Sequence, residues 1–134
     1  MMDVIERTIF VADDDPALLR GIDLALKGRG YAVRTAPSGP ALLTLLESER
    51  PDLLVLDVMM PGMSGLEVLR RIREDERWAH LPVMMVTAYP HVDVREEARQ
   101  RGAGEVMPKP FRLSELLDRI ERYLGGEAGG AELH

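Results

Sequence analysis

Hydrophobic and polar residues follow two alternating patterns along this chain, short apolar runs and longer amphipathic segments. Each apolar run has the length and the aliphatic content of a buried strand. Each amphipathic segment places apolar residues three and four positions apart, which predicts a helix with one face in the core. The predicted strands are residues 8–13, 31–35, 51–57, 81–88 and 105–109, and the predicted helices are residues 15–30, 38–50, 66–76, 91–102 and 112–126.

Five strands that each precede a helix predict a parallel sheet, because right-handed crossovers place helices on both of its faces. The nearly continuous apolar character of the strands agrees, since a central parallel strand is covered on both sides. We therefore predict an α/β fold, a doubly wound sheet of five strands, in one domain over residues 1–124. The glycine-rich residues 125–134 predict a flexible tail or a truncated linker.

Composition removes several classes of function. The net charge of −6 argues against non-specific binding of nucleic acid, which needs a basic surface. The sequence has no cysteine, so disulfides, thiolate metal sites and cysteine nucleophiles are excluded. No apolar run is long enough to span a bilayer, and the first residues lack the pattern of a signal peptide. We expect a cytoplasmic protein that contacts neither a membrane nor nucleic acid through this domain.

Polar residues collect at the carboxyl ends of the predicted strands, where open parallel sheets bind ligands. These residues are Asp13, Asp14, Asp15, Asp57, Thr87 and Lys109. Crowded carboxylates repel one another, and a hard divalent cation held by oxygens, Mg²⁺ first of all, is the natural way to neutralise them. A metal beside a carboxylate, a hydroxyl and a lysine predicts a phosphoryl site, because these groups hold the three oxygens of a transferring phosphoryl group. Asp57 ends a central strand and is the candidate nucleophile.

Four stretches of the chain, FVADDDP, LLVLDVMMPGMSGLEVLRRIR, VMMVTA and GAGEVMPKPF, resemble in order and spacing the receiver domain of two-component response regulators. The resemblance covers roughly residues 8–124. It implies a flavodoxin-like sheet with strand order 2-1-3-4-5. It also implies a phosphoacceptor signalling module that catalyses only its own phosphorylation and dephosphorylation.

By this resemblance, Asp57 takes a phosphoryl group from the phosphohistidine of a sensor histidine kinase or a histidine phosphotransferase. Asp13 and Asp14 match the acidic pair that gathers Mg²⁺ in the family. Asp57 and the backbone carbonyl of Met59 complete the implied set of protein ligands.

The resemblance assigns roles to the ends of the last two strands as well. Thr87 matches the switch hydroxyl, and Lys109 matches the cation that pairs with a phosphoryl oxygen. A cis peptide bond is implied between Lys109 and Pro110. The downstream protein target is expected to bind the fourth helix, the fifth strand and the fifth helix.

Three positions depart from the usual receiver pattern. Val106 stands where receivers commonly carry an aromatic residue that swings inward when the hydroxyl engages the phosphoryl group. Valine has no ring and is stiff about χ1, so we expect the switch to run through Thr87 and backbone shifts, or through Tyr89 in part of the aromatic role. Met59 and Tyr89 occupy two positions that govern access of water to the acyl phosphate, and their bulk predicts slow autodephosphorylation.

Two alternatives remain open from the residues themselves. A haloacid-dehalogenase-like phosphatase would use Asp13 as nucleophile and Asp15 as acid, but it needs a later acidic pair at a strand end, and none follows Lys109. A degenerate receiver that serves only as a scaffold is disfavoured because no residue of the site is missing.

Overall fold

The computed structural model describes the backbone of residues 6–133 and the side chains of residues 6–125. Strands and helices alternate along this part of the chain. The strands are β1 (Thr8–Ala12), β2 (Ala32–Ala36), β3 (Leu53–Asp57), β4 (Val83–Thr87) and β5 (Glu105–Pro108). The helices are α1 (Pro16–Gly28), α2 (Gly39–Ser48), α3 (Gly65–Glu74), α4 (Val92–Gln100) and α5 (Leu113–Leu133), and a 3-10 helix, η1 (Glu76–Trp78), precedes β4. Every predicted strand and helix is present.

The end of α5 departs from the prediction. The helix continues to Leu133, past the glycines at which the tail was expected to begin. An established helix gains one backbone hydrogen bond for each added residue, and the alanine, glutamate and leucine of this segment favour helix, so the glycines weaken the helix without stopping it. The side chains of 126–134 and residues 1–5 lie outside the described residues, and the flexible tail or truncated linker expected for 125–134 stays a prediction.

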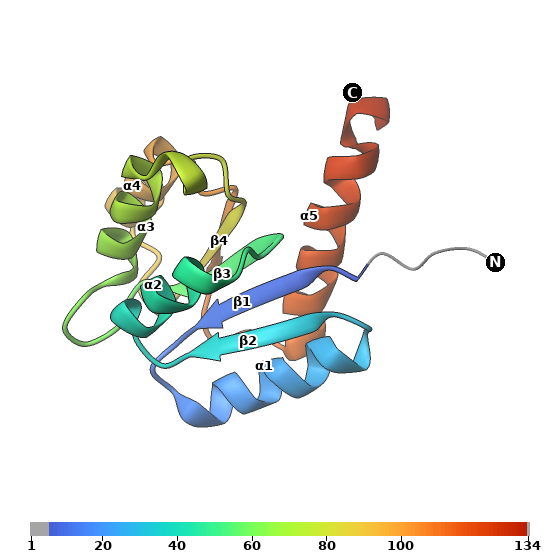
Figure 1. Ribbon diagram of the computed structural model, residues 1–134, viewed down its shortest axis with the longest axis horizontal. Helices are drawn as coiled ribbons and strands as arrows, with labels where there is room; N and C mark the ends of the chain where they lie inside the picture. Colours follow the sequence, from blue (N-terminus) through green and yellow to red (C-terminus); the bar gives the residue numbers. More distant parts are fainter. Residues whose placement is uncertain (1–5, 134) are drawn as a thin grey trace.

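All five strands run parallel in the order β2-β1-β3-β4-β5, which confirms the predicted doubly wound fold. Figure 1 shows α1 and α5 on one side of the sheet and α2, α3 and α4 on the other. Alternate strand residues point to the two sides: Ile9 packs with α1 and α5, whereas Phe10 packs with α2, α3 and α4. Strands β3 and β4 are buried along their whole length, which explains their unbroken apolar sequence.

The first residues of α1 and α2 are set by N-cap side chains that can be recognised in the sequence. Asp15 caps α1, where its side chain accepts hydrogen bonds from the amides of Ala17 and Leu18, and Pro16 takes the first position. Ser38 caps α2 in the same way through the amide of Ala41. These two caps lie in the connections that follow the carboxyl ends of β1 and β2. The described part of the chain has no helix whose length and hydropathy would let it cross a bilayer.

Candidate functional site

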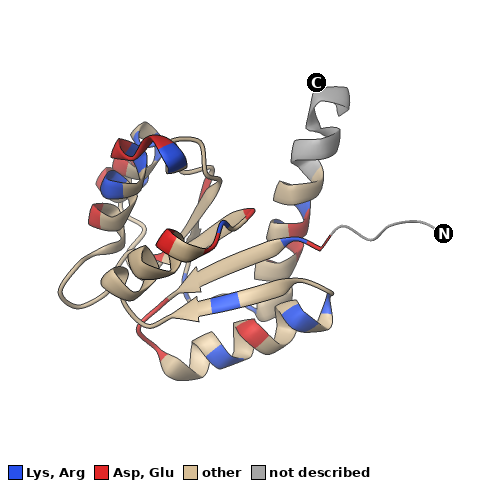
Figure 2. Cartoon of the chain, viewed as in Figure 1, with Lys and Arg blue, Asp and Glu red and all other residues tan. Residues whose placement is uncertain are grey.

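Four strand ends build one site at the carboxyl edge of the sheet. Asp13 directly follows β1, Asp57 ends β3 and Thr87 ends β4. Lys109 directly follows β5, and its backbone amide donates to the carbonyl of Thr87 at 2.7 Å. Because β3 lies between β1 and β4, the strand order places Asp57 at the centre of this edge. Figure 2 shows the acidic segment between β1 and α1 in red at that edge.

Three carboxylates converge there. Asp13, Asp14 and Asp57 each offer an oxygen, and these oxygens lie within 4.8 Å of one another. Asp13 and Asp57 are almost fully buried, at 1% and 2% exposure, whereas Asp14 is exposed. A set of carboxylate oxygens open to solvent on one side fits a hard divalent cation that keeps part of its water shell. Asp15, the fourth acid near this edge, is occupied as the cap of α1.

Lys109 lies between the two buried acids. Its Nζ is 2.7 Å from Oδ2 of Asp13 and 3.5 Å from Oδ1 of Asp57. Burial lowers the pKa of Lys109, but the hydrogen bond to Asp13 and the attraction of Asp57 outweigh it, so the net pKa is raised. The Lys109–Pro110 peptide bond is cis, as predicted. The ammonium thus stays charged beside Asp57, although its shorter contact is with Asp13.

The surroundings of Asp57 disfavour the ionised form of its carboxyl group. Burial and, after it, the neighbouring charge of Asp13 raise the pKa of Asp57 to about 6, against the opposing effect of Lys109. The amide of Met59 donates to Oδ1 of Asp57 at 3.3 Å, which also favours the ionised form. One ammonium therefore does not fully compensate two buried carboxylates, and a second cation would stabilise the site.

Gly65 makes the close approach of α3 to Asp57 possible. A Cβ at this position would overlap the carbonyl oxygen of Asp57, so no larger residue fits without movement of the backbone. The amide of Gly65 donates to the carbonyl of Val58 at 2.8 Å, which ties the start of α3 to the end of β3. From the sequence, Gly65 is expected to serve the turn and the start of this helix; its close contact with the Asp57 backbone leaves no signal in residue type.

Thr87 is fully buried, and its Oγ1 accepts a hydrogen bond from the amide of Tyr89 at 3.0 Å. A hydroxyl that accepts one bond keeps its own hydrogen for a second partner. Tyr89 is 57% exposed and its ring stacks with that of His91, at a centroid separation of 6.3 Å. Val106 is partly buried and packs against the core under α2, α3 and α4. The two expected switch positions therefore differ in exposure, Tyr89 being exposed and Val106 partly buried, and Arg95 bonds the carbonyls of both Pro90 and Val106.

The family model of the response regulator receiver domain matches residues 9–121. The chain belongs to this family. Response regulator MprA of Mycobacterium avium is 42% identical over 116 residues, which are 87% of this chain and 50% of that relative. MprA of Mycobacterium ulcerans has the same identity, over 87% of this chain and 49% of the relative. This receiver therefore spans about half the length of these relatives.

Solved structures agree with the receiver fold. The chemotaxis protein CheY4 of Vibrio cholerae superimposes with a TM-score of 0.83 at 27% identity, over 88% of this receiver and 98% of CheY4. A CheY-like receiver domain protein of Methanospirillum hungatei gives 0.87 at 26% identity, over 94% and 99% of the two chains. The response regulator DrrB of Thermotoga maritima, described as an OmpR/PhoB homolog, gives 0.80 at 30% identity, over 92% of this receiver and 54% of DrrB. The protein is thus a receiver domain, a signalling module of two-component systems.

Proposed function

We propose that this receiver accepts a phosphoryl group on Asp57 from the phosphohistidine of a histidine kinase or a histidine phosphotransferase, in the cytoplasm, and then changes its protein-binding surface. The observation that carries the proposal is the position of Asp57, a buried carboxylate at the centre of the strand ends with Lys109 at 3.5 Å. Membership in the receiver family favours this role over a haloacid-dehalogenase-like phosphatase with Asp13 as nucleophile. In addition, Asp13 already pairs with Lys109 at 2.7 Å and accepts from the amide of Asp15.

In the transfer, an oxygen of Asp57 forms a bond to phosphorus while the bond from phosphorus to the imidazole nitrogen breaks. The bonding electrons return to that nitrogen, so the donor leaves as histidine. Lys109 attracts a phosphoryl oxygen with its ammonium, and Thr87 donates its free hydroxyl hydrogen to another. Both groups favour the state in which charge has spread over the transferring group.

The acidic cluster is proposed to hold Mg²⁺ through Asp13, Asp14, Asp57 and the backbone carbonyl of Met59. The three carboxylates fit this ion, since their oxygens lie within 4.8 Å of one another and hard cations prefer oxygen ligands. When bound, Mg²⁺ would supply positive charge next to the phosphoryl oxygens.

A cleft beside Lys109 provides room for the donor. It has a volume of about 370 Å³ and is lined by Asp15, Leu18, Ala88, Lys109, Pro110 and Phe111. Its apolar lining adjoins the ammonium, so an imidazole ring could pack there while its phosphoryl group faces Asp57. We propose this cleft as the approach route of the phosphohistidine.

The output surface is proposed to comprise α4, β5 and α5. Tyr89 and Val92 are exposed at 57% and 80% near the start of α4, and they offer apolar contact area to a partner. Since Val106 has no ring to move, Tyr89 is the available aromatic group. Replacement of Tyr89 by alanine is expected to weaken partner binding by the phosphorylated form, and an unchanged affinity would exclude Tyr89 as the readout.

Mass spectrometry tests the chemistry directly. The protein is incubated with acetyl phosphate and Mg²⁺, and one added phosphoryl group is expected on wild type and none on Asp57→Asn. Asp52→Asn is the matched control, because Asp52 precedes β3 at the opposite end of the sheet and bonds the amide of Thr8. Labelling that persists in Asp57→Asn, or turnover of small phosphate esters, would refute the proposal.

A further inference from the structure

Arg73, on the last turn of α3, bonds main-chain carbonyls and no carboxylate among the described residues. Its Nε donates to the carbonyl of Arg101 at 2.7 Å, and its Nη2 donates to that of Gly102 at 3.1 Å. Its Nη1 donates to the carbonyl of Trp78 at 3.0 Å. Two of these acceptors are at the C-terminal end of α4, where carbonyls lack helical partners and the helix dipole attracts a cation. The side chain therefore joins α3 and η1 to the end of α4.

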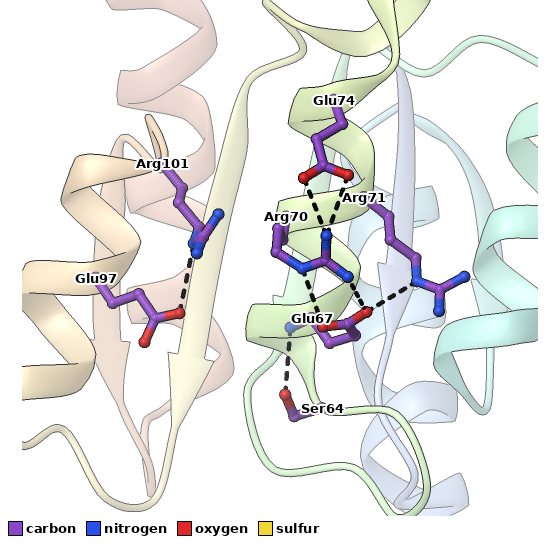
Figure 3. Close-up of polar contacts among 7 residues, drawn as sticks. All are labelled: Ser64, Glu67, Arg70, Arg71, Glu74, Glu97 and Arg101. Carbon is purple, nitrogen blue, oxygen red and sulfur yellow. Dashed lines mark hydrogen bonds and ion pairs between the residues drawn. The ribbon is translucent and has the colours of Figure 1, made fainter.

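The other arginines of α3 bond within their own helix, whereas Arg95 of α4 bonds the carbonyls of Pro90 and, at 3.5 Å, of Val106. Figure 3 shows Arg70 between Glu67 and Glu74 on α3, with Arg71 also bound to Glu67. On α4, the Arg101 side chain pairs with Glu97. Within residues 6–125, the side-chain hydrogen bonds from α3 to the end of α4 all come from Arg73. The side-chain hydrogen bonding between the two helices at this end thus depends on one guanidinium, in addition to the apolar packing of Ile72 and Ala98 in the same core.

The turn after α4 is shaped around this contact. Gly102 has φ +79°, which disfavours any residue with a Cβ, and a Cβ there would lie 3.2 Å from Nε of Arg73. The amide of Gly104 donates to the carbonyl of Val83 in β4 at 2.9 Å, and a Cβ at Gly104 would overlap the hydroxyl of Tyr123 in α5. The C-terminal end of α4 is therefore held from three directions, by α3, by β4 and by α5.

The N-terminal end of α4 is held differently. His91 takes the cap position without a side-chain hydrogen bond, and Val92 is 80% exposed. The buried residue of α4 is Ala98, in its C-terminal half. Just before the helix, the amide of Tyr89 bonds Oγ1 of Thr87 at 3.0 Å. The start of α4 is thus linked to a residue of the phosphoryl site. Its first turns contact the body of the protein through Val94, which packs against the core, and through the 3.5 Å bond of Arg95 to the Val106 carbonyl, whereas its end is held by the shorter bonds of Arg73.

We propose that Arg73 is a positioning residue that anchors the C-terminal end of α4, so that the helix turns about this end when residues 88–91 follow Thr87. The trigger rests on the proposed function, in which Thr87 moves toward a phosphoryl oxygen and its bond to the Tyr89 amide pulls the segment with it. The anchor itself is a property of the unphosphorylated protein. A helix fixed at its C-terminal end passes a shift near Thr87 on to Val92 at its N-terminal end, and it needs no ring at position 106.

Hydrogen exchange of the full chain, read by peptide mass spectrometry, tests the anchor without any phosphoryl group. Arg73→Gln is compared with Arg71→Gln, a matched control on the same helix whose arginine contacts only Glu67 among the described residues. We expect amides of residues 98–104 to exchange roughly tenfold faster in Arg73→Gln than in the control, because hydrogen bonds to a charged donor are lost there. The exchange rates of the amides of β1 and β3 should be the same in both variants. Equal exchange of residues 98–104 in both variants, or a uniform increase that includes β1 and β3, would overturn the anchor.

Two further variants keep the test decisive if Arg73→Gln folds poorly. Arg73→Lys retains the charge but loses the planar fork, so it should give an intermediate effect at residues 98–104. Gly102→Ala perturbs the contact between Arg73 and the turn after α4 from the side of the turn, and it should also speed the amide exchange of residues 98–104. An effect of Gly102→Ala elsewhere, with residues 98–104 unchanged, would count against the anchor.

Addition of beryllofluoride and Mg²⁺, as a mimic of the phosphoryl group, then tests the turning motion. In wild type we expect changed exchange in residues 88–95 and constant protection in residues 98–104. In Arg73→Gln the change should extend to residue 104. If the mimic alters nothing in wild type, the proposed phosphoryl function fails while the comparison without it still decides the anchor. If the mimic alters residues 98–104 equally in wild type and Arg73→Gln, the turning motion is refuted.

Discussion

Replacement of Asp57 by asparagine is expected to stabilise the protein in the absence of Mg²⁺. Asparagine has nearly the same shape, but it removes a charge from a buried position next to Asp13. The pKa of Asp57 is raised from 3.8 to about 6, which means that the folded protein favours the neutral carboxyl group. A residue that is always neutral should therefore suit this position better above pH 6.

The magnitude follows from linkage between proton binding and folding. A shift from 3.8 to about 6 corresponds to about 3 kcal/mol, at about 1.4 kcal/mol per pKa unit. Between these pH values the folded wild type binds more protons than the unfolded chain, so its stability falls as pH rises and is constant above about 6. The gain from Asp57→Asn should thus be complete above pH 6, roughly 1–3 kcal/mol, and should vanish as pH falls toward 3.8.

Urea unfolding at a series of pH values, with EDTA present, measures this gain as a difference in the free energy of unfolding. Asp14→Asn is the matched control, because Asp14 belongs to the same cluster but is exposed, and its gain should stay below about 1 kcal/mol. Addition of Mg²⁺ should stabilise wild type and narrow the difference from Asp57→Asn. A wild type as stable as Asp57→Asn at pH 8 without metal, or a gain that grows toward pH 4, would refute the electrostatic reasoning.

Three other substitutions probe neighbouring parts of the site. Met59→Asn should shorten the lifetime of the acyl phosphate by roughly tenfold, which corresponds to about 1.4 kcal/mol of activation free energy, because an amide can orient water where the thioether excludes it. Loss of radiolabel from the phosphorylated protein over time measures this lifetime, and an unchanged lifetime would contradict the prediction. Lys109→Gln should slow phosphorylation by acetyl phosphate by roughly 10²-fold, measured by mass spectrometry, and a rate equal to that of wild type would show that the ammonium is dispensable. Gly65→Ala should destabilise the fold by at least about 2 kcal/mol, whereas Gly28→Ala, whose Cβ would meet open space, should stabilise it by about 0.5–1 kcal/mol. Urea unfolding measures both changes, and equal effects of the two substitutions would contradict the close contact of Gly65 with Asp57.

The fold was largely predictable because its signals are local. The spacing of apolar residues and the turn residues place the five strands and the five α-helices, though not the 3-10 helix η1, and the caps Asp15 and Ser38 are read directly from residue type. The end of α5 was not, because glycine penalises a helix without forbidding it and the outcome depends on the neighbouring residues.

The site residues are predictable as a set, since strand ends meet at one edge of a parallel sheet. Their pairing is not: Lys109 is closer to Asp13 than to Asp57, a balance of two attractions that depends on fractions of an ångström. Arg73 was missed for a related reason. An arginine among acids on an amphipathic helix looks like a surface residue, and main-chain acceptors far along the chain leave no trace in its local sequence.

Because the site is confined to strand ends, the residues of the proposed chemistry are separate from most of the charged residues on the protein surface. The proposed chemistry uses a handful of side chains on the sheet, while most lysines, arginines, aspartates and glutamates lie on the helices and connections around it (Figure 2). The outer helix faces can therefore change without altering the acceptor, which fits the retention of the fold in structures only 26–30% identical. For protein engineering, the specificity of this receiver for its donor and its target should be adjustable as a surface property, with the phosphoryl chemistry left intact.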